Sequence, residues 1–444
     1  MLKILIGEKL MINNKLKLVT ALSCALGVAT PASVFATNGM FLIAPGTKSR
    51  GMGGVSITRT HDTLTSAINP ATMAHTGNRF DIGGDIFAAT SEATLGEAGI
   101  NQATVESKPE HMAISPGIYI MPNMGASWNE GDLSYGFTMV PVGGGGSQYD
   151  FNLFNNVLGG DTSNKMGVSL MVMNINPTIA YKLDENNSVG ATLIIGLQVF
   201  KAYGLEQFLQ FTSTQDETAQ FTNNGTDISY GAGVRLGWLG IFGDMRFGAE
   251  YTSQTYMSKF DDYKDLFAEQ GQMNTPGNIG LGASYDVNKK LTVALDINYI
   301  MYEDVAAVSN PGPDPRATTA FPVDRATNAL GEDEGLGFGW SNQTVFKLGL
   351  EYLFDNKLTL RGGWNYGESP INEETSILFN ITAPAVVQHH LTMGATYQLD
   401  KESEVSISYV HAFESEQFGP TYIGSEGSIS MSQNSIGMTY SMNF

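Results

Sequence analysis

Apolar and polar residues alternate through residues 428–444, at the end of the chain. One parity is apolar and ends on an aromatic residue: Ile436, Met438, Tyr440, Met442 and Phe444. The other parity carries Ser, Gly, Thr and Asn. Successive side chains of a β-strand point to opposite faces, so this pattern predicts a strand with one apolar and one polar face. The same alternation recurs in residues 291–301, 346–352 and 391–399.

From residue 79 onward the chain divides into about 14 such segments, near the length that a tilted membrane strand needs. Short polar turns are expected at 129–131, 184–187, 240–243, 286–290, 354–357 and 399–402. Long loops are expected at 96–111, 143–167, 206–226, 256–277, 304–341, 368–385 and 415–427. This alternation of short and long connections predicts an all-β protein, a transmembrane antiparallel β-barrel with both ends in the periplasm. An aromatic girdle near the turns is expected from Tyr181, Tyr285, Tyr352, Tyr397 and Tyr440.

Residues 1–36 have the features of a secretory signal peptide. Four lysines accompany an apolar run, 18–28, that is too short to span a membrane. We expect cleavage after Ala36, with Met11 as an alternative start. A lipoprotein signal at Cys24 is the other interpretation, although Ala21 to Ser23 match a lipobox poorly.

Residues 37–78 lack the alternation of the segments that follow. A short helix is expected after Thr60 and should end before Pro70, which cannot continue it. The segment is too polar to lie in lipid, so it either folds in the periplasm or plugs the lumen. The predicted organisation is therefore a signal peptide (1–36), an N-terminal plug or hatch (37–78) and a barrel (79–444).

Composition narrows the class of protein. The formal charge of −20 becomes −23 once the net +3 of residues 1–36 is removed, which disfavours binding to nucleic acid. Cys24, the only cysteine, is lost with the predicted signal. After residue 36 there is no run of about 18 apolar residues, so membrane helices are not expected.

Several motifs resemble the long-chain fatty-acid transporters of Gram-negative outer membranes, a family that includes channels for toluene-like hydrocarbons. The motifs are Gly51–Gly54, Asn69-Pro70-Ala71, Leu360–Trp364 with Glu368–Ile371, and His389–Gly394. The resemblance implies a 14-stranded barrel plugged by an N-terminal hatch. It also implies an extracellular groove for an apolar ligand, a site in the lumen, and sideways release through a gap at a kinked third strand.

The third strand, starting at Leu133, runs into four consecutive glycines, Gly143, Gly144, Gly145 and Gly146. Glycine weakens strand pairing, so a bulge or gap is expected there, or else the flexible root of a loop. With Asn69, Pro70 and Ala71 these glycines are our candidates for the hatch and gate.

Apolar residues also collect where a water-filled pore or an exposed loop should be polar. The candidates for contact with a hydrophobic ligand are Val140, Val142, Phe151, Leu153, Phe154, Ile194, Phe200, Phe260 and Phe267. In the loops, Phe260 and Phe267 recur at helical spacing with Tyr263, so loop helices that merely cap the barrel are the other interpretation.

Seven charged residues occupy strand positions whose side chains should face the lumen: Arg235, Arg246, Glu250, Asp296, Lys347, Glu351 and Arg361. Opposite charges on neighbouring strands can pair and anchor a hatch. Alternatively, Lys347, Arg361 or Lys201 binds the carboxylate of a ligand. The resemblance implies a basic pair for this purpose in the fatty-acid members.

No pattern in the sequence points to an enzyme. The six histidines show neither hydrolase nor metal-ligand spacing, so we expect no catalytic residue, metal or cofactor. The predicted function is uptake of hydrophobic small molecules, long-chain fatty acids first and hydrocarbons next, by a monomer in the outer membrane. Its expected partners are outer-membrane lipid, lipopolysaccharide and the barrel-assembly machinery. A general porin or an adhesin-like structural barrel is the alternative.

Overall fold

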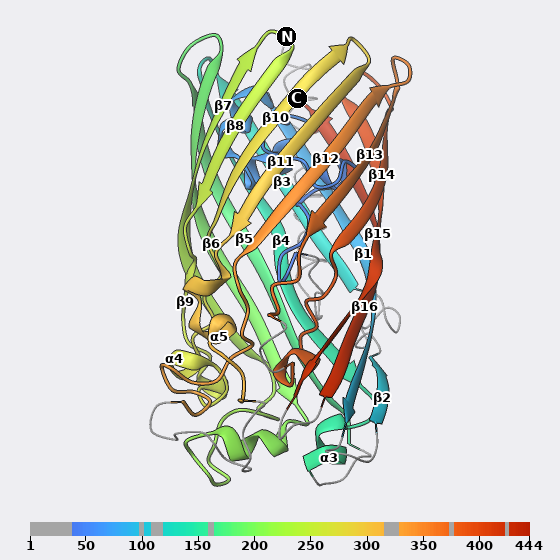
Figure 1. Ribbon diagram of the computed structural model, residues 1–444. Helices are drawn as coiled ribbons and strands as arrows, with labels where there is room; N and C mark the ends of the chain where they lie inside the picture. Colours follow the sequence, from blue (N-terminus) through green and yellow to red (C-terminus); the bar gives the residue numbers. More distant parts are fainter. Residues whose placement is uncertain are drawn as a thin grey trace, which may run out of the picture.

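A computed structural model describes residues 38–96, 102–107, 119–158, 164–314, 328–372, 377–421 and 426–444. Within these ranges, fourteen antiparallel strands form one closed barrel (Figure 1). They are β1 (Arg79–Gly96), β3 (Tyr119–Glu130), β4 (Leu133–Tyr149), β5 (Met166–Lys182), β6 (Asn187–Tyr203), β7 (Asp227–Phe242), β8 (Met245–Thr252), β10 (Asn278–Asn288), β11 (Leu291–Ile300), β12 (Gln343–Leu353), β13 (Leu358–Gly367), β14 (His389–Gln398), β15 (Ser403–Pro420) and β16 (Glu426–Asn443). The barrel closes where β1 pairs with β16, from Arg79 opposite Asn443 to Leu95 opposite Gly427. Closure gives each edge strand a partner, which the membrane requires because lipid offers no hydrogen bonds. The predicted 14-stranded fold is confirmed.

The two ends of the barrel differ as the sequence predicted. The tight turns and the C-terminus lie at one end, and the long loops with their short helices lie at the other (Figure 1). Four of the turns share one hydrogen-bond pattern: a side-chain oxygen accepts the backbone N–H groups two and three residues further on. The residues that supply this oxygen are Asp184, Asn288, Asp355 and Asp400. Such Asx turns fix the short periplasmic connections.

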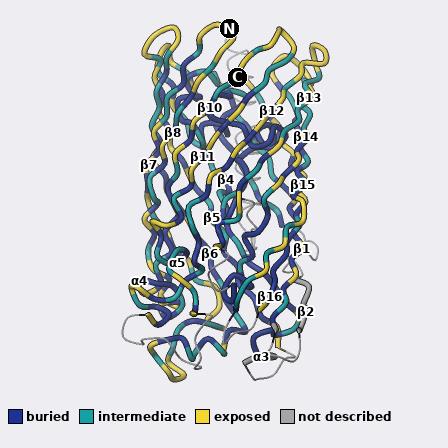
Figure 2. The backbone as a smooth tube through the Cα atoms, viewed as in Figure 1, coloured by how far each residue is buried: buried dark blue, intermediate teal, exposed yellow. Residues whose placement is uncertain are grey.

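Exposure alternates along the strands (Figure 2). In β16, Ile436 and Met438 are 58% and 56% exposed, whereas Thr439 and Ser441 are buried. The apolar parity therefore faces outward, where the bilayer lies. The five girdle tyrosines are also exposed, as predicted. No helix in the part of the chain that the structure describes is long and apolar enough to cross a membrane.

The N-terminal segment, residues 38–78, lies inside the barrel (blue in Figure 1). It contains α2 (Thr47–Arg50), η1 (Thr63–Ala67) and η2 (Pro70–His75). The helix expected after Thr60 is the 3-10 helix η1, which Asp62 caps by accepting the N–H of Thr65 at 3.2 Å.

The loops at the extracellular end form a thick cap. Its elements are β2 (Gln102–Ser107), α3 (Leu153–Leu158), η3 (Glu206–Phe211), β9 (Tyr256–Met257), η4 (Asp261–Tyr263), α4 (Ala268–Gly271), η5 (Tyr302–Asp304), α5 (Ala306–Ser309) and η6 (Phe379–Ile381). One expectation was wrong: residues 256–270 do not form a helix that carries Phe260 and Phe267 on one face. The chain there has β9, η4 and the start of α4, and Glu269 and Gln270 have positive φ angles of 58° and 55°. The aromatic side chains are held together by tertiary packing and not by helical periodicity.

Candidate functional site

Carboxylates on the wall hold the backbone of the N-terminal segment. Asp296 of β11 accepts the N–H groups of Ser56 and Ile57 at 2.7 and 3.0 Å. Asp81 of β1 accepts both the N–H and the hydroxyl of Thr63, at 2.8 and 2.7 Å. Each of these side chains accepts two hydrogen bonds from the segment, so these contacts dock the segment in the lumen.

The candidate residues Asn69, Pro70 and Ala71 dock the same segment near β7. The Asn69 amide donates to the carbonyls of Ile57 and Trp238 at 2.8 and 2.9 Å. Its side-chain oxygen accepts the N–H of Ala71 at 3.0 Å and so caps η2, in which Pro70 occupies the first turn. This short motif therefore ties together η2, the chain before it and strand β7.

The four glycines lie within β4, the third strand of the barrel, and not at the root of a loop. The pairing of β4 with β5 is bulged between Pro141 and Gly143, and Gly144 and Gly146 have φ angles of 154° and 156°. The loop that we expected from residue 143 begins only after Tyr149. The expected bulge is thus present in this strand.

On the other edge of β4, pairing with β3 ends at Met139, opposite Met124. Beyond this point the N-terminal segment bonds to β4. The Leu42 N–H donates to the carbonyl of Val142 at 3.0 Å, and the Gly144 N–H donates to that of Met40 at 2.9 Å. The first part of the segment therefore forms hydrogen bonds with the edge of β4 beyond the point where the pairing of β4 with β3 ends.

A cavity of about 80 Å³ lies between the N-terminal segment and the wall. Three of the predicted ligand-contacting residues, Val140, Val142 and Ile194, line it together with Phe41 and Leu42 of the N-terminal segment. These side chains make part of the lumen apolar. We call this space the lumen cavity.

The lumen cavity also has charged residues in its lining, and these are bound to protein groups. Lys347 donates to the carbonyl of Ile43 at 3.0 Å. Arg235 donates to Thr252 Oγ1 at 2.7 Å and to the carbonyl of Ala67. The Thr252 hydroxyl in turn donates to Glu250 at 3.0 Å. The cations of this cavity therefore have partners within the protein.

A second apolar cavity, of about 40 Å³, lies in the extracellular cap. Phe200 and Phe267, both predicted, line it with Phe208, Phe338 and Phe379. The ring of Phe200 lies 4.8 Å from that of Phe267, and the ring of Phe208 lies 4.8 Å from that of Phe379. We call this space the cap cavity.

The other predicted aromatic residues pack around the cap cavity. The Phe260 ring lies 5.6 Å from that of Phe200, and the Phe154 ring lies 4.7 Å from that of Phe208. Leu153 is buried in the same cluster, and Phe151 packs against it. The nine apolar candidates thus divide between the lumen cavity and the cap.

The three head-group candidates do not come together. The Lys201 ammonium lies 5.3 Å from the centre of the Tyr203 ring near the cap. Lys347 lies at the lumen cavity. Arg361 lies towards the periplasmic end, where it donates to Glu351 at 2.7 Å and to Thr396 at 2.6 Å. The structure brings no two of these cations together as a pair.

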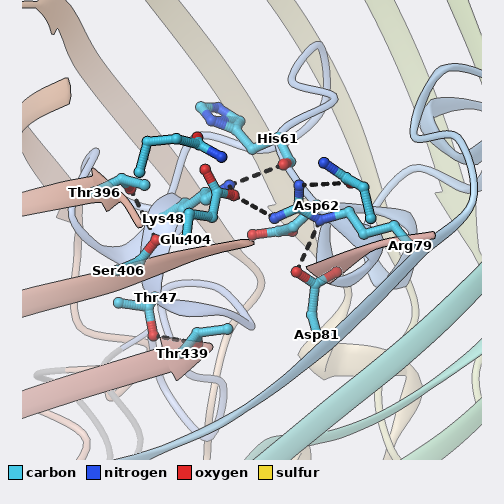
Figure 3. A network of polar contacts seen from close by, with 12 residues as sticks. Thr47, Lys48, His61, Asp62, Arg79, Asp81, Thr396, Glu404, Ser406 and Thr439 are labelled. Carbon is cyan, nitrogen blue, oxygen red and sulfur yellow. Dashed lines mark hydrogen bonds and ion pairs between the residues drawn. The ribbon is translucent and has the colours of Figure 1, made fainter. Parts of the chain in front are cut away.

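Ion pairs connect the N-terminal segment to the wall near the periplasmic end (Figure 3). Lys48 lies 2.5 Å from Glu404 of β15, which also pairs with Arg79. Arg79 is 2.9 Å from Asp81. Arg59 of the segment also pairs with Glu351 of β12, which fits the interpretation of the inward charges as anchors. Among the described residues, no group of three or more His, Cys, Asp and Glu side chains is placed to hold a metal ion.

The nine candidates lack three rings of the cap cavity, Phe208, Phe338 and Phe379. Phe379 belongs to an apolar run, 377–379, within a loop that should be polar, and this run was a usable signal. Phe338 stands between glycines and has no comparable signal.

A closed barrel with an apolar outer face and an internal N-terminal segment defines an outer-membrane β-barrel protein. Residues 29–429 match the family model described as outer membrane protein transport protein (OMPP1/FadL/TodX). The chain belongs to this family of outer-membrane transport proteins.

Solved structures with the same fold include toluene transporters. TbuX of Ralstonia pickettii matches with a TM-score of 0.63 and 19% identity over 91% of this chain and 99% of its own. TodX of Pseudomonas putida matches with a TM-score of 0.62 and 19% identity over 89% and 97%. A FadL homologue of Pseudomonas aeruginosa matches with a TM-score of 0.63 and 14% identity over 91% and 100%. No curated protein sequence matches the chain.

Proposed function

We propose that this protein is a channel for the uptake of neutral hydrophobic compounds, with hydrocarbons ahead of long-chain fatty acids. The observation that carries this order is the state of the lumen cations: Lys347 and Arg235 already donate to protein carbonyls and hydroxyls. A ligand carboxylate would compete with these partners and with the neighbouring carboxylates of Asp296 and Glu250, whereas an apolar molecule would not. The toluene transporters among the structural neighbours support the same order. In this proposal residues 1–36 are a cleaved signal peptide and residues 37–78 form the hatch.

We further propose a route from the cap cavity to the lumen cavity and then sideways past β4. The ligand moves down its gradient, and burial of its surface contributes about 25 cal/mol per Å². Two features support sideways release: pairing between β3 and β4 ends at Met139, and the lumen nearer the periplasm is lined by charged groups such as Lys48, Arg59 and Arg361. An apolar molecule gains nothing by entering that charged region.

The test is binding of radiolabelled toluene and of a long-chain fatty acid to the purified full-length protein. Phe200→Ala removes a ring from the cap cavity and should weaken toluene binding at least about tenfold, since even one methylene group in an apolar pocket is worth about 10- to 200-fold. Phe354→Ala is the matched control, because Phe354 lies in a periplasmic turn and is 55% exposed. Toluene binding to the native protein is expected, with little change in the control.

Substitution of the cations separates the two ligand classes. Lys201→Met, Lys347→Met and Arg361→Met should each leave toluene binding nearly unchanged. A selective loss of fatty-acid binding in one of them would place fatty acids first and overturn the proposed order. Failure of both ligands to bind, together with a large steady conductance in planar bilayers, would instead indicate a general porin.

A further inference from the structure

A third cavity, of about 360 Å³, lies at the periplasmic end of the lumen and differs in chemistry from the other two. It is lined by Lys48, Arg59, Thr60, His61, Lys289, Lys290, Thr292, Glu351, Leu353, Thr359 and Arg361. The N-terminal segment supplies one side of it, and the strands and turns from β10 to β13 supply the other. We call it the periplasmic cavity.

The periplasmic cavity is rich in positive charge within a chain of formal charge −20. Its lining includes five lysine and arginine side chains and one carboxylate, that of Glu351. The carboxylate of Glu351 lies 2.5 Å from the guanidinium of Arg59, 2.7 Å from that of Arg361 and 3.2 Å from Nδ1 of His61. Two guanidinium groups therefore share one carboxylate, which leaves positive charge uncompensated at this point.

Two neighbouring acids, Glu404 and Asp286, are each shared with a further cation. Glu404, which pairs with Lys48, also pairs with Arg79. Asp286, which accepts the Thr292 hydroxyl at the cavity edge, pairs with Arg246. Each of these carboxylates thus lies beside a second cation of its own.

We propose that the periplasmic cavity binds a small oxyanion, with the chemistry of inorganic phosphate, that enters from the periplasm. Guanidinium groups offer paired N–H donors that match phosphate oxygens, and lysine adds point charge. The anion would contact Arg59 on the N-terminal segment and Arg361 and Lys290 on the wall, and so link the two. The binding residues line the lumen, which favours a soluble anion over the phosphate of a lipid head group. This inference does not depend on which compound the channel transports.

The experiment is calorimetric titration of inorganic phosphate into the purified full-length protein in detergent, at ionic strength matched with potassium chloride. The Lys289→Met/Lys290→Met double variant removes two exposed cations of the lining, neither of which pairs with Glu351. It should bind phosphate about tenfold more weakly and keep its fold. The matched control is Lys357→Met/Lys401→Met, which changes two exposed lysines of neighbouring periplasmic turns outside the lining.

Thermal unfolding provides a second measurement, because a ligand that binds only the folded state raises its midpoint. Phosphate should raise the midpoint of the native protein and of the control, and raise it less in the Lys289/Lys290 variant. Three results would overturn the inference: no saturable phosphate binding, equal loss in both double variants, or displacement by chloride at the same ionic strength. Binding of phosphatidylglycerol vesicles without binding of inorganic phosphate would overturn it as well.

Discussion

Gly143 is the position at which a single methyl group should open the contact between the N-terminal segment and β4. A Cβ atom at this position would collide with the carbonyl oxygen of Met40. Gly145, two residues further along the strand, has no atom within 4 Å of the place where its Cβ would lie. Gly143→Ala therefore tests the contact, and Gly145→Ala is its matched control.

The magnitude follows from the hydrogen bonds that the collision would break. Two backbone bonds hold the segment to β4 here, from Leu42 to Val142 at 3.0 Å and from Gly144 to Met40 at 2.9 Å. A net contribution of about 0.5–1.5 kcal/mol for each bond gives about 1–3 kcal/mol in total. That free energy corresponds to a rise of about 5- to 150-fold in the population in which this contact is open.

Hydrogen exchange of the Leu42 and Gly144 amides measures this population directly. In Gly143→Ala both amides should exchange faster by the stated factor, and in Gly145→Ala they should exchange at the native rate. Uptake of a hydrophobic compound by cells should rise in the first variant only. Native exchange rates in a folded Gly143→Ala protein would refute the conclusion that a side chain at position 143 opens the contact between the N-terminal segment and β4.

Two further predictions concern the anchor of the N-terminal segment and the periplasmic turns. Asp296→Ala should destabilise the protein by about 3–5 kcal/mol in denaturant unfolding, because it removes the acceptor of two buried N–H groups and the cross-strand partner of Lys347; a loss below about 1 kcal/mol would contradict this role. The Ser403 hydroxyl and two backbone N–H groups donate to Asp400 and hold its pKa below the usual value of about 3.9. The stability that these bonds give the turn should therefore be fully present above about pH 3.9. It should be lost only as the pH falls through the lower pKa of the folded state. Amide exchange of Ser403 measured from pH 7 to pH 3 checks the second prediction, and a loss of protection already between pH 7 and pH 5 would contradict it.

The sequence by itself determined the barrel and the outward face of its strands. Alternation with a period of two is a local property, since successive Cβ atoms point to opposite faces whatever the strand pairs with. It therefore showed which residues face lipid, as in β16, where Ile436 and Met438 are exposed. Turn chemistry is equally local: Asp184 and Asp400 supply the oxygen that closes their own turns.

Only the tertiary structure decided how the site is assembled. The contact of Gly143 with Met40 joins residues about a hundred positions apart, and it exists because β3 leaves the edge of β4 free at that point. Lys347 and Glu351 share the inward parity, yet one meets Ile43 and the other meets Arg59 at a different depth. Parity specifies the face of a strand but not the neighbour across the lumen. That neighbour depends on barrel closure and on the path of the N-terminal segment, which no local pattern encodes.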